Sequence, residues 1–146
     1  MIDVSTREYM SVMREMTDQG HEISMTIVGT SMEPFLVHMR DKICFRKPER
    51  PLKKGDMVFY QRMSGEYVMH RIHRIEKNGY YLAGDHQTTL EGPIHRKQIF
   101  AIVTEAERNG MWIDQGDRVW KFYAGCWRKL FWVRKMINKL KRIIQK

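Results

Sequence analysis

Residues 57–83, MVFYQRMSGEYVMHRIHRIEKNGYYLA, are the part of the sequence that decides the fold. They consist of short runs rich in Val, Ile, Tyr and Phe, a composition typical of β-strands. Two turn signals divide these runs, Ser64-Gly65 and Asn78-Gly79, and the second is the strongest hairpin signal in the chain. The stretch therefore predicts consecutive strands joined by tight turns.

The same pattern extends outward in both directions, from residue 21 to about residue 104. Turn residues such as Gly55-Asp56 and Gly84-Asp85 separate the apolar runs there as well. This part of the chain is therefore expected to form a β-sheet. The candidate strands are residues 22–28, 41–46, 57–62, 66–76, 80–83 and 98–103.

Two segments with helical spacing flank the expected sheet. Apolar residues recur at helical intervals in residues 5–19, and Gly20 would end that helix. Near the other terminus, tryptophans and aliphatic residues follow one side of a helix and Lys and Arg the other, with a break near Gly125. The predicted fold class is mainly β (α+β). Its segments are an N-terminal helix (1–20), a β-rich domain (21–116) and a basic amphipathic tail (117–146).

The length and the cysteines limit the class of protein. A chain of 146 residues with 42% hydrophobic content can fold as one domain with its own core. Cys44 and Cys126 have no paired spacing, so neither a disulfide framework nor a zinc site is expected. The N-terminal residues contain no apolar region typical of a secretory signal, and no apolar run could span a bilayer. The expected location is the cytoplasm, peripheral to a membrane surface.

The net charge of +9 comes from the tail. Residues 1–116 contain 16 Lys and Arg and 16 Asp and Glu, whereas residues 117–146 contain ten basic residues, one acid and three of the four tryptophans. Tryptophan beside Lys and Arg on an amphipathic helix favours an anionic membrane surface as the partner. Packing of the tail on the domain or on a partner is a second interpretation, and nucleic-acid binding is the least favoured.

Residues 28–34, VGTSMEP, place Ser31 directly after an apolar strand. A glycine stands two residues before this serine and a proline three residues after it, so the serine is expected to be exposed on a turn. Strand ends commonly carry Ser for hydrogen bonding, and these residue types alone leave its role open.

The motif GTSMEP resembles the nucleophile motif of signal peptidases and of the related self-cleaving LexA-type repressors. Three further motifs follow in the order of these families. LKKGDMVFYQ resembles their next strand, YVMHRIHRI the strand that bears the general base, and YYLAGDHQ their GDN segment. The resemblance spans roughly residues 23–103 and implies the signal-peptidase and LexA-like β-fold.

The resemblance also implies a serine endopeptidase that cleaves a precursor or leader peptide without a cofactor. Ser31 matches the nucleophile, His70 the general base and Asp85 the acid that would orient the imidazole. Most bacterial relatives have lysine as the base, whereas the endoplasmic-reticulum and archaeal type of signal peptidase has histidine. An imidazole titrates near neutral pH without the desolvation that a lysine base requires.

Substrate contacts are expected along the same segment. An extended substrate would bond to the strand edge at residues 24–28, and the N–H of Ser31 would stabilise the oxyanion. Many signal peptidases have a serine two residues before the nucleophile for this role, whereas this chain has Gly29. The residues expected to bind substrate are Gly29, Thr30, Met32 and Pro34.

Other functions remain open at this point. A metal site could use imidazoles and carboxylates, but residues three apart on a strand point to opposite faces, so no metal is expected. A catalytically weak or inactive relative could bind peptides or membranes through the same scaffold, and a basic adaptor could act through the tail. The residues considered for a metal are His70, His73, Asp85, His86 and His95.

Overall fold

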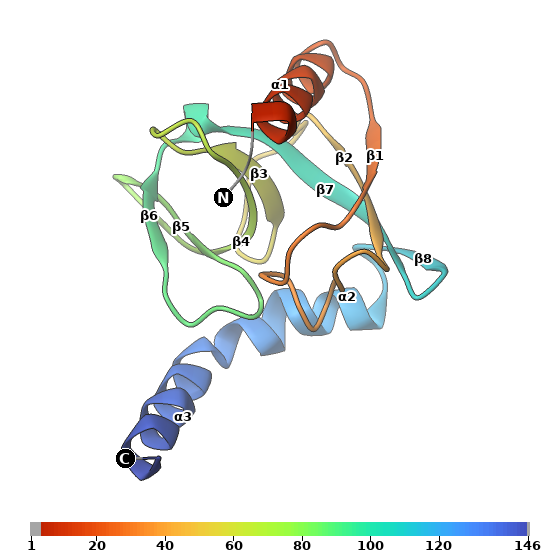
Figure 1. The fold of residues 1–146 in the computed structure, drawn as a ribbon. Coiled ribbons are helices and arrows are strands. Elements are labelled where there is room, and N and C mark those ends of the chain that lie inside the picture. The colour runs from red at the N-terminus through yellow and green to blue at the C-terminus, as the bar shows by residue number, and fades with distance from the viewer. Residues whose placement is uncertain (1–3, 146) are drawn as a thin grey trace.

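A computed structural model describes residues 4–145 as one antiparallel sheet of eight strands with helices at both ends of the chain (Figure 1). The strand order is β1-β2-β7-β3-β4-β5-β6, and β8 pairs with β7 outside this path. The predicted mainly β fold is confirmed. Residues 1–3 and 146, in the outer predicted segments, lie outside the described residues. The strands are β1 (Ile23–Thr26), β2 (Lys42–Arg46), β3 (Met57–Gln61), β4 (Tyr67–Glu76), β5 (Gly79–Ala83), β6 (Glu91–Ile94), β7 (Ile99–Arg108) and β8 (Met111–Asp114).

Capping residues mark the end of the first helix and the start of the second. The first helix is followed by Gly20, whose φ of +91° is a left-handed conformation that suits glycine. Asp117 caps the second helix by accepting from the N–H groups of Val119 and Trp120. Among residues 4–145, no helix is long and apolar enough to cross a bilayer. The helices are α1 (Val4–Asp18), the 3₁₀ turn η1 (Arg96–Gln98), α2 (Arg118–Phe122), the π-helical turn η2 (Tyr123–Trp127) and α3 (Phe131–Ile144).

Two strands, β6 and β8, were not predicted from the sequence, and β7 is longer than expected. β6 contains Pro93 and lies at one end of the sheet, where a residue without an N–H removes no ladder bond. β8 returns along β7 through Asn109-Gly110, which both have positive φ, as a tight hairpin turn requires. This second Asn-Gly pair extends β7 to Arg108 instead of residue 103.

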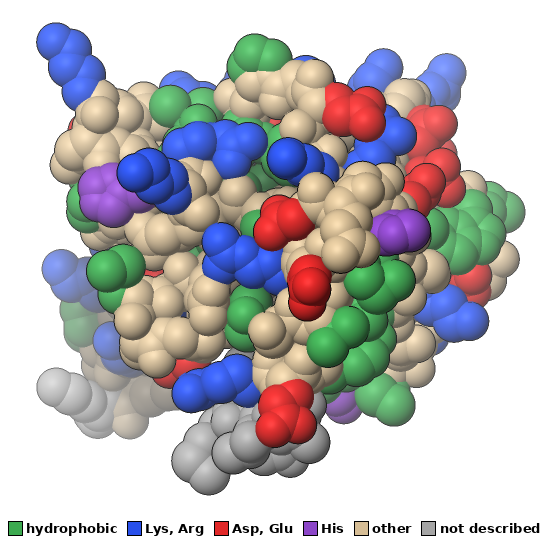
Figure 2. Space-filling model, turned by 90° about the horizontal axis from the view of Figure 1, so that it is seen from above, with side chains coloured by type: hydrophobic (Ala, Val, Ile, Leu, Met, Phe, Trp, Pro, Cys, Tyr) green, Lys and Arg blue, Asp and Glu red, His purple; other side chains and the backbone are tan. Residues whose placement is uncertain are grey.

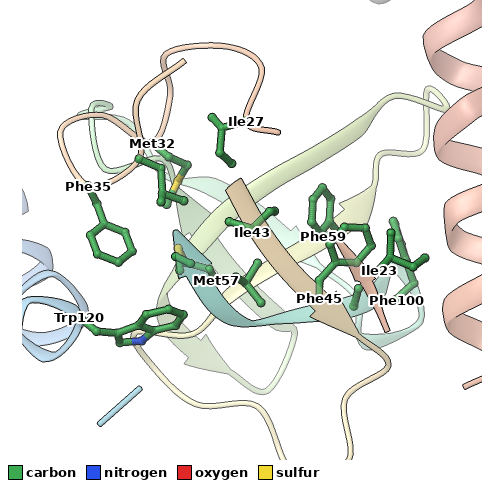
Figure 3. Close-up of a cluster of buried hydrophobic side chains, with 14 of the residues drawn as sticks. Ile23, Ile27, Met32, Phe35, Ile43, Phe45, Met57, Phe59, Phe100 and Trp120 are labelled. Atoms are coloured by element: carbon green, nitrogen blue, oxygen red, sulfur yellow. The ribbon is translucent and has the colours of Figure 1, made fainter. Parts of the chain in front are cut away.

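The core lies on both faces of β3. Met57 and Phe59 pack into the larger hydrophobic cluster, whereas Val58 and Tyr60 pack into a smaller one on the opposite face. Figure 3 shows the larger cluster, in which the Trp120 ring lies against Phe35 with the ring centroids 5.6 Å apart. The first helix of the predicted tail is therefore part of the core of the β-domain.

The surface on the α1 side has mixed charge. Figure 2 views the molecule from this side, and Lys and Arg side chains are interspersed there with Asp and Glu. Residues 1–116 contain equal numbers of acidic and basic residues, which agrees with this mixed surface. The excess positive charge of the chain lies in residues 117–146.

Candidate active site

Ser31 lies on the turn after β1, between an exposed glycine and a buried methionine. Gly29 has a φ of +97°, which glycine adopts without strain, and its N–H donates to Nδ1 of His38 (2.7 Å). Met32 is 2% exposed and fixes the other side of the turn in the core. The Ser31 side chain is therefore half-buried on a well-anchored turn.

The loop after β5 holds the backbone of Ser31 from the other side. The N–H of His86 donates to the Ser31 carbonyl oxygen (2.9 Å). Gly84 lies so close that a Cβ in its place would collide with the carbonyl and the Cβ of Ser31. A glycine at this position therefore allows the two segments to meet.

A cavity of about 550 Å³ opens beside Ser31. β4 pairs with β5 only from Arg71 onward, so within residues 4–145 its first residues have no strand partner on that side. Val68 and Met69 are neighbours on β4 and point to opposite faces of the sheet, yet both line the cavity. The cavity therefore runs along the free edge of β4. β1, at one end of the sheet, borders it as well. Other lining side chains are mostly apolar: Tyr9, Met10, Met25, Ile27, Ile43 and Phe59.

His70 follows Met69 on β4 and is only 4% exposed. Burial lowers the pKa of His70 to about 4, so its ring is neutral near neutral pH and can accept a proton. Within residues 4–145, the Ser31 hydroxyl forms no hydrogen bond to this ring or to Asp85. Catalytic hydrogen bonds are often long before substrate binds. The segments that carry Ser31 and His70 border the same cavity.

Tyr60 and Glu91 connect His70 to a carboxylate. The Tyr60 hydroxyl lies 3.1 Å from Nδ1 of His70 and donates its proton to Glu91 Oε1 (2.8 Å). A phenol has only one proton to donate, so its oxygen must accept from Nδ1–H of the neutral ring. This assigns the proton to Nδ1 and leaves the lone pair of Nε2 available as a base.

The surroundings of Glu91 keep it ionised. Burial alone would raise the pKa of Glu91, but hydrogen bonds from Arg62 and Tyr60 bring it below its usual value. Two nitrogens of Arg62 bind the carboxylate, at 2.9 and 2.8 Å. Burial and the adjacent Glu91 raise the pKa of Tyr60, so the phenol keeps its proton.

Asp85 binds Arg71 and not His70, which corrects the role expected from the sequence. Nε and Nη2 of Arg71 donate to the two carboxylate oxygens (2.8 and 2.9 Å), and both side chains are fully buried. His70 and Arg71 are neighbours on a strand and therefore point to opposite faces. Asp85 lies on the Arg71 face, whereas His70 lies beside Tyr60 on the other.

The remaining predicted substrate residues are divided by the structure. Gly29 and Met32 line the cavity beside Ser31. Thr30 and Pro34 are exposed and are not among the lining residues. In the part of the chain that the structure describes, no group of three or more His, Cys, Asp or Glu could hold a metal ion.

Residues that the motifs did not identify as functional also support the site. Tyr60 and Glu91 were not predicted, because nothing in their local pattern separates them from ordinary strand residues. Nor were Trp127 and Arg134 in the tail, which donate to the backbone carbonyl of Asp85, each at 2.8 Å. The tail therefore helps to fix the loop that contacts Ser31.

The comparisons with known proteins show the family of the chain. No curated protein and no solved structure gave a significant match to the chain. The model of one family, described as Peptidase S24-like, matches residues 2–104, which include Ser31, His70 and the strands that border the cavity. The chain therefore belongs to the Peptidase S24-like family, which indicates an activity of the serine peptidase type.

Proposed function

We propose that this protein is a serine endopeptidase that resembles the Ser-His type of signal peptidase and cleaves a precursor or leader peptide. The observation that carries the proposal is that β4, the strand of His70, borders the cavity that Ser31 lines. The His70 ring is also neutral, and its Nδ1 is bonded to Tyr60. Membership of the Peptidase S24-like family supports the same chemistry.

The proposed reaction is acyl transfer through Ser31. Its Oγ attacks the scissile carbonyl carbon while Nε2 of His70 accepts the hydroxyl proton. The N–H of Ser31 donates to the oxyanion, and the C–N bond then breaks as the imidazolium returns the proton to the leaving amine. Water, deprotonated by the same ring, hydrolyses the acyl-enzyme and restores the Ser31 hydroxyl.

The shape of the cavity favours an extended peptide substrate. Free strand edges on β1 and on the first half of β4 border it, and each can form backbone hydrogen bonds with an added strand. The mostly apolar lining accepts apolar side chains at alternate positions of such a peptide.

The alternative is a relative that binds peptides without cleaving them. It is favoured by Gly29, which has no hydroxyl for the oxyanion and whose N–H already donates to His38. Binding of a peptide library by the wild-type protein, without any product, would support this alternative.

The test uses a proteome-derived peptide library, with cleaved bonds identified by mass spectrometry. Ser31→Ala and His70→Ala are each expected to reduce the cleavage rate by at least about 10³-fold. Ser64→Ala and His95→Ala, which change exposed residues of the same types, serve as matched controls and should cleave normally. Unchanged cleavage by Ser31→Ala would contradict the proposal.

A further inference from the structure

A second pocket, of about 230 Å³, lies between β4 and the start of α3. It shares no lining residue with the cavity beside Ser31. Cationic side chains form one part of its lining, and aromatic rings form another. The residues that determine its chemistry are His73, Arg74, Arg128, Lys129, Phe131 and Trp132.

His73 lines this pocket and has an unpartnered polar atom. Its residue is 9% exposed, and among residues 4–145 its Nε2 has no hydrogen-bond partner. Burial, together with nearby cations of which Arg128 is the strongest, lowers the pKa of His73 to about 3. The ring is therefore neutral and carries one N–H. A buried polar atom without a partner is unfavourable, and an anion in the pocket would accept from it.

The pocket also has an excess of positive charge. No Asp or Glu lines it. Of its three cations, only Arg74 forms an ion pair in the part of the chain that the structure describes, with Glu76 (2.9 Å). Burial and the neighbouring Arg71 lower the pKa of Arg128, as expected for a cation close to other cations. The two anionic oxygens of a phosphodiester can accept hydrogen bonds from such a set of donors.

α3 presents an exposed apolar face next to this pocket. Trp132 is 58% exposed, lines the pocket and begins the apolar face. Figure 1 shows α3 running away from the sheet, so the face is not covered by the β-domain. Lys135 and Lys139 lie beside the face at helical spacing, as in helices that bind at membrane surfaces. The face comprises Trp132, Val133, Met136, Ile137, Leu140 and Ile143, all exposed.

We propose that this pocket binds the phosphate headgroup of an anionic membrane phospholipid while the apolar face of α3 lies among the acyl chains. One lipid would thus satisfy both features, because Trp132 belongs to the pocket and to the face. Trp prefers the boundary between headgroups and acyl chains, and each nearby Lys or Arg strengthens attraction to anionic lipid. The proposal does not depend on the peptidase activity.

The first test measures co-sedimentation of the full chain with vesicles. We expect binding to phosphatidylcholine vesicles that contain phosphatidylglycerol, and little binding to pure phosphatidylcholine. The pocket variant Arg74→Gln/Lys129→Gln should reduce binding at least about tenfold, since it removes two cations near the lipid surface. The control Lys53→Gln/Lys97→Gln removes the same charge from exposed sites outside the pocket and should reduce binding less than about threefold.

The second test separates the apolar face from the pocket. Met136→Gln/Leu140→Gln changes two exposed side chains of α3, and Met63→Gln/Met111→Gln changes two exposed side chains elsewhere as the matched control. Only the first variant should lose vesicle binding. If α3 instead pairs with a second copy of this chain, light scattering would show a wild-type dimer that this variant converts to a monomer, which would overturn the proposal.

The third test identifies the headgroup site without a membrane. Glycerol phosphate added to the full chain should shift the NMR signals of the His73 ring in the wild type and in the α3 face variant, but not in the pocket variant. Unchanged His73 signals, or vesicle binding that is insensitive to Arg74→Gln/Lys129→Gln, would contradict a headgroup site in this pocket.

Discussion

The buried ring of His70 depends on a hydroxyl and a carboxylate that lie on other strands. The Tyr60 hydroxyl accepts a hydrogen bond from Nδ1 of His70, and the Glu91 carboxylate accepts one from Tyr60. The carboxylate is therefore connected to the imidazole through the Tyr60 hydroxyl. Burial is the main reason that the pKa of His70 is low, while Glu91 raises it and Arg62 lowers it. We infer that Tyr60 and Glu91 are positioning residues, which fix the tautomer and stabilise the imidazolium during the reaction.

The Glu91→Gln variant tests this inference through a pH profile. In the wild type, kcat/KM should fall only as the pH drops through about 4, because His70 is neutral above that pH. Loss of the Glu91 charge lowers the pKa of His70 further, so the acid limb moves to lower pH. The plateau of kcat should fall by about tenfold to hundredfold, with KM unchanged, because the imidazolium loses its counter-charge.

Glu66→Gln is the control for this experiment. Glu66 also binds Arg62, at 2.9 Å, but it is half-exposed at the surface, and the Tyr60 hydroxyl donates to Glu91 instead. The kcat plateau and the acid limb of kcat/KM of Glu66→Gln should match those of the wild type. If Glu91→Gln has a wild-type profile while Ser31→Ala is inactive, the positioning role is wrong and the peptidase assignment still stands.

Groups from three elements fix the loop between β5 and β6. Arg71 on β4 binds both carboxylate oxygens of Asp85 and also donates to the Gly55 carbonyl (2.8 Å). Trp127 and Arg134, which lie in η2 and α3, bind the carbonyl of Asp85. The backbone of this loop in turn holds Ser31. The buried ion pair is thus a connection between the sheet and the nucleophile turn.

Asp85→Asn is expected to destabilise the fold by about 3–5 kcal/mol, because it leaves the Arg71 guanidinium buried without a counter-charge. Urea unfolding measures this loss as a lower free energy of unfolding. The double variant Arg71→Met/Asp85→Leu removes both charges and should recover much of it. A double variant as unstable as Asp85→Asn would mean that the hydrogen bonds of the pair, and not its unbalanced charge, determine the loss.

Acid should destabilise the whole molecule through two buried histidines. His70 and His73 are neutral in the fold, with pKa values of about 4 and about 3, whereas an unfolded histidine has a pKa near 6.5. Between these values the unfolded chain binds more protons than the folded one. The free energy of unfolding is therefore fully present above about pH 6.5 and falls as the pH drops toward 4 and 3.

Urea unfolding at about pH 7 and about pH 4.5 measures this loss. His73→Phe, which fills a site already packed against Phe131, should lose less stability on acidification than the wild type, by more than about 1 kcal/mol. His95→Asn changes an exposed histidine and should keep the wild-type pH dependence. An equal acid loss in all three proteins would show that His73 does not carry a depressed pKa.

The sequence by itself determined six of the eight strands, most of the turns and the order of the motifs. Residue composition indicates whether a segment forms a buried strand, and Gly-containing turns such as Asn78-Gly79 indicate where the chain reverses. β3, β4 and β5 therefore lie within one or two residues of the predicted ranges. Both are local properties of the chain. Ser31 and His70 could be proposed as nucleophile and base because the motifs that resemble the family are contiguous in the sequence.

Only the tertiary structure decided which polar side chains meet. Asp85 and Glu91 are both acids near the end of β5, and the motif resemblance favoured Asp85, whereas the structure connects Glu91 to the imidazole through Tyr60. Strand alternation directs Arg71 and His70 to opposite faces, and the pairing of β6 with β5 brings Glu91 to the face of His70. Register and face depend on the assembled sheet, because hydrogen bonds between distant segments set them.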